Sequence, residues 1–211
     1  MTEFREKWEK RKISFYKRME KDIVSGYFDK EMIPVIKTLF KLKDAYPTSS
    51  CSGRILILAS RVPWRKRNVK IMFKFHEINE QVRQDILEKV LALEDENLWL
   101  FVQPPIIHVS CYNVDTAIKL VKVARNTGFK ESKIFMDSPM GSHLELKGKV
   151  LLIVPIRLEK TFLFEKEKLK LVFDEASRIL EDFKVKISKL QNEIEKALET
   201  KLFETDMKFE K

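Results

Sequence analysis

Glycine, cysteine and histidine are scarce in this chain of 211 residues, which has five glycines, two cysteines and three histidines. The two cysteines give no metal-ligand spacing. No Gly-x-Gly-x-x-Gly follows a strand, which argues against a doubly wound cofactor-binding sheet. No apolar run approaches the roughly 18 residues of a membrane helix, and no signal-peptide pattern opens the chain. We therefore expect a cytoplasmic protein with no membrane partner. Cys51 and Cys111 should be thiols there, with a bridge between them as the alternative in a thermophile.

Positive charge exceeds negative charge. Lysine and arginine total 41 against 32 aspartates and glutamates, so the formal net charge at pH 7 is +9 and the pI is about 9.4. By itself, this balance suits a polyanionic partner such as RNA or an anionic membrane surface and does not choose between them. Because 44% of the residues are hydrophobic, the chain can bury one sizeable core. We predict a single domain over residues 1–211.

The middle of the chain alternates short apolar runs with amphipathic segments. β-Branched and aromatic runs predict strands at 55–59, 69–75, 98–102, 106–111, 132–137, 142–146 and 149–156. Helical periodicity predicts helices at 31–43 and 80–93, and a third from Asn113, which can cap it, to Gly128, which can end it. The order strand–helix–strand occurs at 69–102 and again at 106–137, which hints at an internal duplication by pattern only.

Short links between strands decide the predicted fold class. The links near Pro104, Met140 and Gly148 are too short for helical crossovers, so the strands that they join should be antiparallel neighbours. We predict an α+β fold with a mixed or largely antiparallel sheet over residues 45–158, and a barrel-like closure stays open as a variant. A doubly wound parallel sheet fits this order of elements poorly.

Long amphipathic helices are predicted at both ends, over residues 3–24 and about 165–206. The second carries a near-heptad apolar seam, formed by Leu169, Val172, Ala176, Ile179, Phe183, Ile187, Leu190, Ile194 and Ala197. Three arrangements are open. Each helix could pack on the sheet, the two could pair, which we prefer, or the C-terminal helix could form a homodimeric coiled coil. The oligomeric state, monomer or dimer, is therefore left undetermined.

A polar segment, Thr48-Ser49-Ser50-Cys51-Ser52-Gly53-Arg54, precedes the first buried run. It predicts a loop delivered by a strand, with hydroxyls and backbone N–H groups directed at one place. Gly53 allows a positive φ, and Arg54 can donate two hydrogen bonds to a carboxylate or phosphate. The alternatives are a hydrophilic turn with a buried thiol, and a structural salt bridge for Arg54.

Two further features could carry function. His108 and His76 each lie in or at the end of a strand, where a histidine is either a catalytic base or a satisfied core residue. The alternation of strand side chains predicts that His108 shares a face with Ile106 and Ser110. A basic turn follows the first buried run, with Trp64, Arg65, Lys66 and Arg67. Cations and one ring suit RNA, although the same turn could be a solvated hairpin.

The sequence resembles the tRNA wybutosine-synthesizing protein 3 family. The polar segment 48–54 matches the signature of that family, and 104–109, Pro-Pro-Ile-Ile-His-Val, is similar to its segment of proline, apolar residues and histidine. Residues 124–132 resemble its Ala…Gly-Phe-Arg-x-Ser pattern. His76 resembles a further family histidine, and Asp22, Gly26 and Asp29 its N-terminal acidic and glycine positions. The chain departs from the pattern at Gln103, where the family usually has glutamate, and lacks the glycines ahead of the second strand.

This resemblance implies an S-adenosylmethionine-dependent methyltransferase that modifies the ring N-4 of a 4-demethylwyosine-type guanosine beside the anticodon of phenylalanine tRNA. It implies that residues Ser49, Ser50, Cys51, Ser52, Gly53 and Arg54 bind the cofactor, that His108 and His76 are the catalytic candidates, and that no metal is needed. Trp64 to Arg67 would then contact the tRNA.

Two other classes of protein stay open on the residues alone. Charge and terminal helices by themselves are also typical of a non-catalytic RNA-binding or scaffold protein. A serine-rich loop would also suit a hydrolase of phosphate-containing ligands. Binding of S-adenosylmethionine discriminates between the methyltransferase and the RNA-binding scaffold.

Overall fold

The computed structural model describes residues 3–65, 68–76, 80–138, 141–149 and 152–209. Over these residues the chain is an α+β protein that divides into two compact units. The first unit comprises Met1–Ser52, Pro105–Lys149 and Lys184–Lys211, and the second comprises Gly53–Pro104 and Val150–Phe183. The chain therefore changes unit at four points along the sequence. The single domain expected from the sequence stays a prediction.

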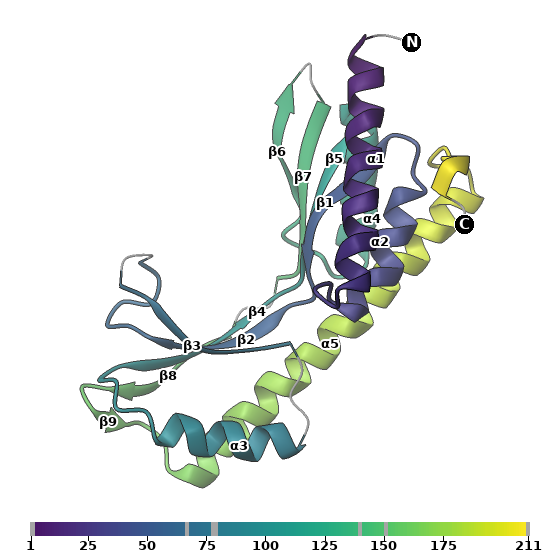
Figure 1. Cartoon of the computed structure of the whole chain (residues 1–211). Helices are drawn as coiled ribbons and strands as arrows, with labels where there is room; N and C mark the ends of the chain where they lie inside the picture. The colour runs from purple at the N-terminus through teal and green to yellow at the C-terminus, as the bar shows by residue number, and fades with distance from the viewer. Residues whose placement is uncertain (1–2, 66–67, 77–79, 139–140, 150–151, 210–211) are drawn as a thin grey trace. The chain divides into compact units, whose positions relative to one another are not determined.

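The sheet of the first unit has the strand order β1-β5-β7-β6 (Figure 1). Its strands are β1 (Ala45–Cys51), β5 (Ile106–Cys111), β7 (Gly141–Lys147) and β6 (Lys133–Ser138), and neighbours are antiparallel. Alternation along β5 and β7 separates two faces. Ile107, Val109, Leu144 and Leu146 are fully buried on one face, whereas His108 and Glu145 belong to the other.

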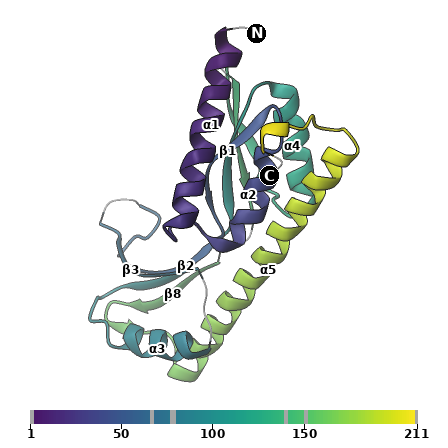
Figure 2. The same ribbon diagram turned by 45° about the vertical axis from the view of Figure 1, so that its right-hand side comes forward.

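Helices lie on both sides of this sheet (Figure 2). The apolar face packs against α2 (Ile33–Phe40), α4 (Val114–Asn126) and the part of α5 (Lys166–Glu199) that belongs to this unit. As predicted, Asn113 caps α4: its side-chain oxygen accepts from the N–H of Thr116 at 2.8 Å. Gly128 follows α4 with a φ of +105°. Helix α1 (Glu3–Val24) lies over the opposite face, where the Trp8 ring packs on Tyr46 and Tyr112.

The residues after α5 pack against α1 and form hydrogen bonds with it. Lys12 is buried, and its Nζ donates to the Leu42 carbonyl at 2.5 Å and to the Asp206 carboxylate at 2.9 Å. Burial lowers the pKa of Lys12, and Asp206 opposes that shift. The rings of Tyr16 and Phe209 are in contact nearby. The segment that follows α5, the C-terminal tail, is therefore in contact with the N-terminal helix.

The sheet of the second unit has the strand order β3-β2-β4-β8-β9. Its strands are β3 (Lys70–Phe75), β2 (Arg54–Ala59), β4 (Leu98–Gln103), β8 (Leu152–Leu158) and β9 (Thr161–Phe162). Helix α3 (Glu80–Leu91) and the first part of α5 cover one face. Leu56, Leu58 and Phe101 form a small separate cluster on the other face, with Val69 and Trp99 beside them.

Each unit contains one of the predicted strand–helix–strand segments, in the same arrangement. In the first unit β5 and β6 flank β7, and in the second β3 and β4 flank β2. The flanking strands run parallel to each other and are joined by a helix, while the strand between them is antiparallel to both. The middle strand of the first unit, β7, follows its strand–helix–strand segment in the sequence. The middle strand of the second unit, β2, precedes its segment.

Three predictions about the strands need correction. One sheet was expected, but the strands of the described residues form two antiparallel sheets, with no barrel closure among them. The links at Pro104 and Gly148 are not hairpins, because they join strands of different sheets. Thr48–Cys51 is strand rather than loop: it belongs to β1, an edge strand whose register shifts between Pro47 and Ser49. Edge strands tolerate proline and such bulges.

The C-terminal helix is shorter than expected and ends at Glu199. Its apolar seam is used within the chain. Leu169, Phe173, Ala176, Leu180 and Phe183 belong to the core of the second unit, and Ile187, Leu190, Ile194 and Ala197 belong to that of the first. Among the described helices, we find none with the length and apolar character needed to cross a membrane.

Candidate active site

A row of polar side chains crosses the first sheet from strand to strand. The register places Ser49 of β1 opposite His108 of β5, and His108 opposite Glu145 of β7. Ser49 Oγ lies 2.8 Å from His108 Nδ1, and Glu145 Oε2 lies 3.4 Å from His108 Nε2. Lys133 of β6 extends the row, with its Nζ 3.6 Å from the other carboxylate oxygen of Glu145.

The row favours one tautomer of the His108 ring. A carboxylate beside Nε2 favours the tautomer that carries a hydrogen there, because only an N–H interacts favourably with it. Nδ1 then accepts the hydroxyl hydrogen of Ser49. A proton arriving at Ser49 can pass to His108 Nδ1, while the Glu145 carboxylate lies beside the other ring nitrogen. The order hydroxyl, imidazole, carboxylate is the arrangement of a general base with an orienting group.

The row is open to solvent at both ends, at Ser49 and Lys133, and is most buried at Glu145. His108 is 37% exposed and Glu145 is 18% exposed, while Ser49 at the end of the row is exposed. Further along the same face, α1 covers Tyr46, and Ser110 is buried. The open part of this face is therefore the part that carries the titratable row. As predicted, Ile107 and Val109 are buried on the opposite face.

The turn after β1 is fixed by an acidic residue. The backbone N–H of Ser52 donates to Asp29 Oδ2 at 2.9 Å, and the Ser52 hydroxyl donates to the same oxygen at 3.1 Å. Gly53 has a φ of +97°, the conformation that favours glycine. The predicted positive φ is thus confirmed. Asp29 is positioned just before the short helix at Lys30–Met32.

Arg54 and His76 are placed in the second unit. Arg54 Nε donates to the Gln103 side-chain oxygen at 2.7 Å across the β2–β4 pair. His76 Nδ1 lies 3.0 Å from the carbonyl oxygen of Gly53. A carbonyl only accepts, so this contact requires a hydrogen on Nδ1. The structure therefore brings together Ser49 with His108 in one unit, and His76 with Gly53 in the other.

The predicted tRNA-binding turn is described only in part. Lys66 and Arg67 lie outside the described residues. Trp64 is 68% exposed, and its ring stands edge-on to Trp99 at 5.9 Å. Trp99 Nε1 in turn donates to the carbonyl of Ser60 at 2.8 Å. The exposed Trp64 ring therefore packs edge-on against Trp99, and a hydrogen bond to the backbone fixes the position of the Trp99 ring.

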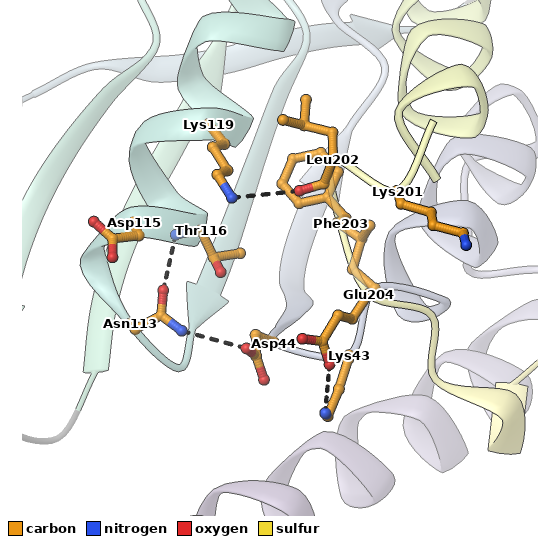
Figure 3. A pocket seen from close by; sticks show the side chains of 11 residues that line it. Lys43, Asp44, Asn113, Asp115, Thr116, Lys119, Lys201, Leu202, Phe203 and Glu204 are labelled. Carbon is orange, nitrogen blue, oxygen red and sulfur yellow. Dashed lines mark hydrogen bonds and ion pairs between the residues drawn. The ribbon is translucent and has the colours of Figure 1, made fainter. Parts of the chain in front are cut away.

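A separate cavity of about 290 Å³ lies in the first unit (Figure 3). It is bounded by the start of α4, by residues 42–44 and by residues 201–204. Its polar groups contact one another: Asn113 Nδ2 donates to Asp44 at 3.3 Å, and Lys119 donates to the Leu202 carbonyl at 3.4 Å. Among the described residues, the predicted site residues do not line it. The contact of Lys119 with Leu202, together with that of Lys43 Nζ with Glu204 Oε2 at 2.5 Å, holds the C-terminal tail in place.

Glu145 and Asp29 are the groups that sequence reasoning left out of the site. Alternation in 141–147 would have placed His143 and Glu145 on one face. Only the register shows that Glu145 is opposite His108. Likewise, the two cysteines are far apart in register: Cys51 pairs with Ile106, and Cys111 pairs with Ala45 at the other end of β5. Burial raises the pKa of the Cys111 thiol.

The fold and the site define an α+β protein built from antiparallel sheets, outside the doubly wound enzymes that bind cofactors through glycine-rich loops. Comparison with known sequences then identifies the family. Residues 10–196 match the profile of Methyltransferase TYW3, and the chain belongs to that family.

Relatives cover most of the chain. It is 32% identical over 187 residues to the tRNA(Phe) 7-((3-amino-3-carboxypropyl)-4-demethylwyosine(37)-N(4))-methyltransferase of Saccharolobus solfataricus, covering 88% of each chain. It is 28% identical to the corresponding methyltransferase 1 of Pyrococcus horikoshii, over 90% of this chain and 96% of that one. The fold is similar to that of the PH1069 protein from Pyrococcus horikoshii, with a TM-score of 0.82 at 27% identity, covering 92% of this chain and 98% of that one.

Proposed function

We propose that this protein transfers a methyl group from S-adenosylmethionine to the ring N-4 of a 4-demethylwyosine-type guanosine in phenylalanine tRNA. The names of the relatives support the substrate, and the net charge of +9 suits RNA. The observation that carries the chemistry is the row from Ser49 through His108 to Glu145. Membership of a methyltransferase family makes a non-catalytic scaffold role the weaker candidate.

The residues around the β1–β2 turn have groups that suit the methyl donor. S-adenosylmethionine supplies a methyl group on a positively charged sulfur, together with an amino acid part and a ribose. The hydroxyls of Ser49 and Ser50 can bond the ribose or the carboxylate, and Asp29 beside Ser52 suits an ammonium group. Cys51, Ser52 and Gly53 shape the turn. Arg54 would complement a carboxylate or a phosphate.

The polar row supplies the base. In the proposed step the ring nitrogen loses its proton to Ser49 Oγ, Ser49 gives its own proton to His108 Nδ1, and Glu145 stabilises the imidazolium. The deprotonated nitrogen could then accept the methyl group that a bound donor would supply, with the electron pair of the carbon–sulfur bond left on sulfur. Holding the reactants in this geometry can supply several kcal/mol, up to about 7–11. His76 acts by orienting the Gly53 carbonyl.

Binding and turnover test this function directly. Calorimetry should give a clear heat for S-adenosylmethionine. Incubation with phenylalanine tRNA that carries the 4-demethylwyosine-type base should add one methyl group to that nucleoside, as read by mass spectrometry. The same tRNA with an unmodified guanosine should gain none. Absence of heat at high donor concentration, together with an unmodified nucleoside, would sink the proposal.

A further inference from the structure

A β-bulge places two large apolar side chains on the open face of the first sheet. The register of β6 against β7 shifts between Ile134, which is opposite Leu144, and Met136, which is opposite His143. Phe135 is the extra residue. Bulges of this kind redirect a side chain and are frequent beside active sites. Phe135 and Met136 are each 52% exposed, on the edge strand seen in Figure 1.

Phe135 lies directly beside the polar row. Its ring centroid is 5.9 Å from that of His108, with the two planes at 84°, and 6.3 Å from that of His143, at 31°. The Phe135 ring therefore reaches across the face to both histidines, although its strand is at the sheet edge. Two exposed apolar side chains on an edge strand promote unwanted association. Their exposure at this point is therefore best explained by a ligand that packs on them.

The chemistry of this surface suits a flat heteroaromatic ring. An exposed phenyl ring offers a face for stacking, and a thioether adapts to the shape of what packs on it. Positive groups are nearby: Lys133 belongs to the same strand, and Arg11 of α1 acts electrostatically on His143. A ring stacked on Phe135 would lie nearly perpendicular to the His108 imidazole, with its edge toward the polar row.

We propose that Phe135, with Met136 beside it, is the surface on which the flat base to be methylated stacks next to His108. This inference rests on the proposed function and names a recognition residue for it. The adenine of the methyl donor is also flat, and its occupation of this surface is an outcome of the test. A larger ring system covers more of the Phe135 ring and removes more apolar surface from water, so the tricyclic base gains more from stacking here than guanosine does.

The test uses the full chain and three variants. Phe135→Ala removes the ring, Phe135→Trp keeps a flat face, and Ile118→Ala is the matched control. Ile118 belongs to α4, on the other side of the same sheet, and is exposed to a similar degree. Two affinities are measured for each protein: that for phenylalanine tRNA with the tricyclic base relative to the same tRNA with guanosine, and that for S-adenosylmethionine.

We expect Phe135→Ala to weaken binding of the tRNA with the tricyclic base about 5- to 150-fold, the range that stacking of one base provides, and to weaken binding of the guanosine tRNA less, so that the preference falls. Phe135→Trp and Ile118→Ala should keep the preference, and donor affinity should not change in any of them. A preference equal to that of the unmutated protein in Phe135→Ala overturns the inference. So does a loss confined to donor affinity, which would place the adenine on this ring.

Failure of the inference and failure of the proposed function are distinguishable. If the unmutated protein methylates the base and Phe135→Ala does so with the same kcat/KM and the same base preference, only the stacking surface is wrong. If the unmutated protein methylates nothing, the proposed function is wrong. The binding preference still decides whether Phe135 holds a flat base, because it needs no turnover.

Discussion

The faces of the two sheets that lie opposite α4 and α3 differ in chemistry, although each unit contains a similar strand–helix–strand segment. In the first unit the open face carries a hydroxyl, an imidazole and a carboxylate in register across β1, β5 and β7. In the second unit the corresponding face carries apolar side chains, with the Trp64–Trp99 pair near a basic turn. A hydroxyl, an imidazole and a carboxylate in register suit proton transfer, and the exposed Trp64 ring in a basic turn suits RNA.

From this comparison we propose that the first unit supplies the chemistry and that the Trp64 turn of the second unit contributes RNA contacts. The site depends on the serine-rich segment being a strand rather than a loop. A strand register holds Ser49 opposite His108 at hydrogen-bond distance, as a strand pair does and a solvated loop does not. Substitutions in one unit at a time therefore test the two proposed roles separately.

The largest effect is expected at His108. His108→Ala removes the group that takes the proton, so turnover should fall about 10²- to 10⁴-fold while tRNA affinity stays the same. Glu145→Gln, which keeps shape but removes charge, should show a smaller loss in the same parameter. If His108 has only a structural role, His108→Ala should instead lower the melting temperature and leave activity per folded molecule intact.

The second effect concerns the turn after β1. Ser50→Ala combined with Ser52→Ala should weaken binding of S-adenosylmethionine by about 1–3 kcal/mol, because the ligand loses the Ser50 hydroxyl and the turn loses the hydrogen bond from the Ser52 hydroxyl to Asp29. Calorimetry measures this, and circular dichroism checks that the variant is folded. Thr116→Ala, a hydroxyl deletion on α4, is the control and should bind normally. An unchanged affinity in the folded double variant would remove the assigned role from these serines.

A smaller effect is expected in the second unit. Replacing Arg65, Lys66 and Arg67 by alanine should weaken tRNA binding about tenfold at moderate salt and flatten the dependence of affinity on salt, since fewer counterions are released. Donor affinity should stay constant. Affinity is measured by filter binding at several salt concentrations. A salt slope equal to that of the unmutated protein would make this turn a solvated hairpin.

The smallest effect concerns pH and His143. Burial, and then the charge of Arg11, lowers the pKa of His143 below its ordinary value of 6.5. The unfolded chain therefore binds more protons than the folded one between the lowered pKa and 6.5. Stability should be complete above that window and fall as pH falls through it. His143→Gln should make the melting temperature less dependent on pH there. An identical pH dependence in both proteins would contradict this.

Much of the fold could be predicted from local pattern. The spacing of Phe4, Trp8 and Phe15 predicted α1, and Asn113 was correctly identified as a cap. What could not be predicted is which strand lies beside which. The links at Pro104 and Gly148 are as short as hairpins, yet they lead to different sheets, because pairing depends on contacts distant in sequence.

For the site, too, the local pattern could be predicted and the pairing of strands could not. The alternation Ile106, His108, Ser110 predicted that His108 is on the mixed face of its strand. The resemblance pointed to Ser49 and His108 as separate candidates. Their meeting at 2.8 Å, and the role of Glu145, come from the register of β1, β5 and β7. The bulge at Phe135 was not foreseen either, since 132–137 reads as an ordinary strand.

The most direct test of the division between the two units is one pair of measurements on two variants, His108→Ala and Trp64→Ala. Single-turnover methyl transfer is followed at saturating tRNA, and the tRNA dissociation constant is measured on the same preparations. The account predicts that His108→Ala loses the rate at unchanged affinity, whereas Trp64→Ala loses about 5- to 150-fold in affinity at an unchanged rate. A fall in the same parameter for both variants would contradict it.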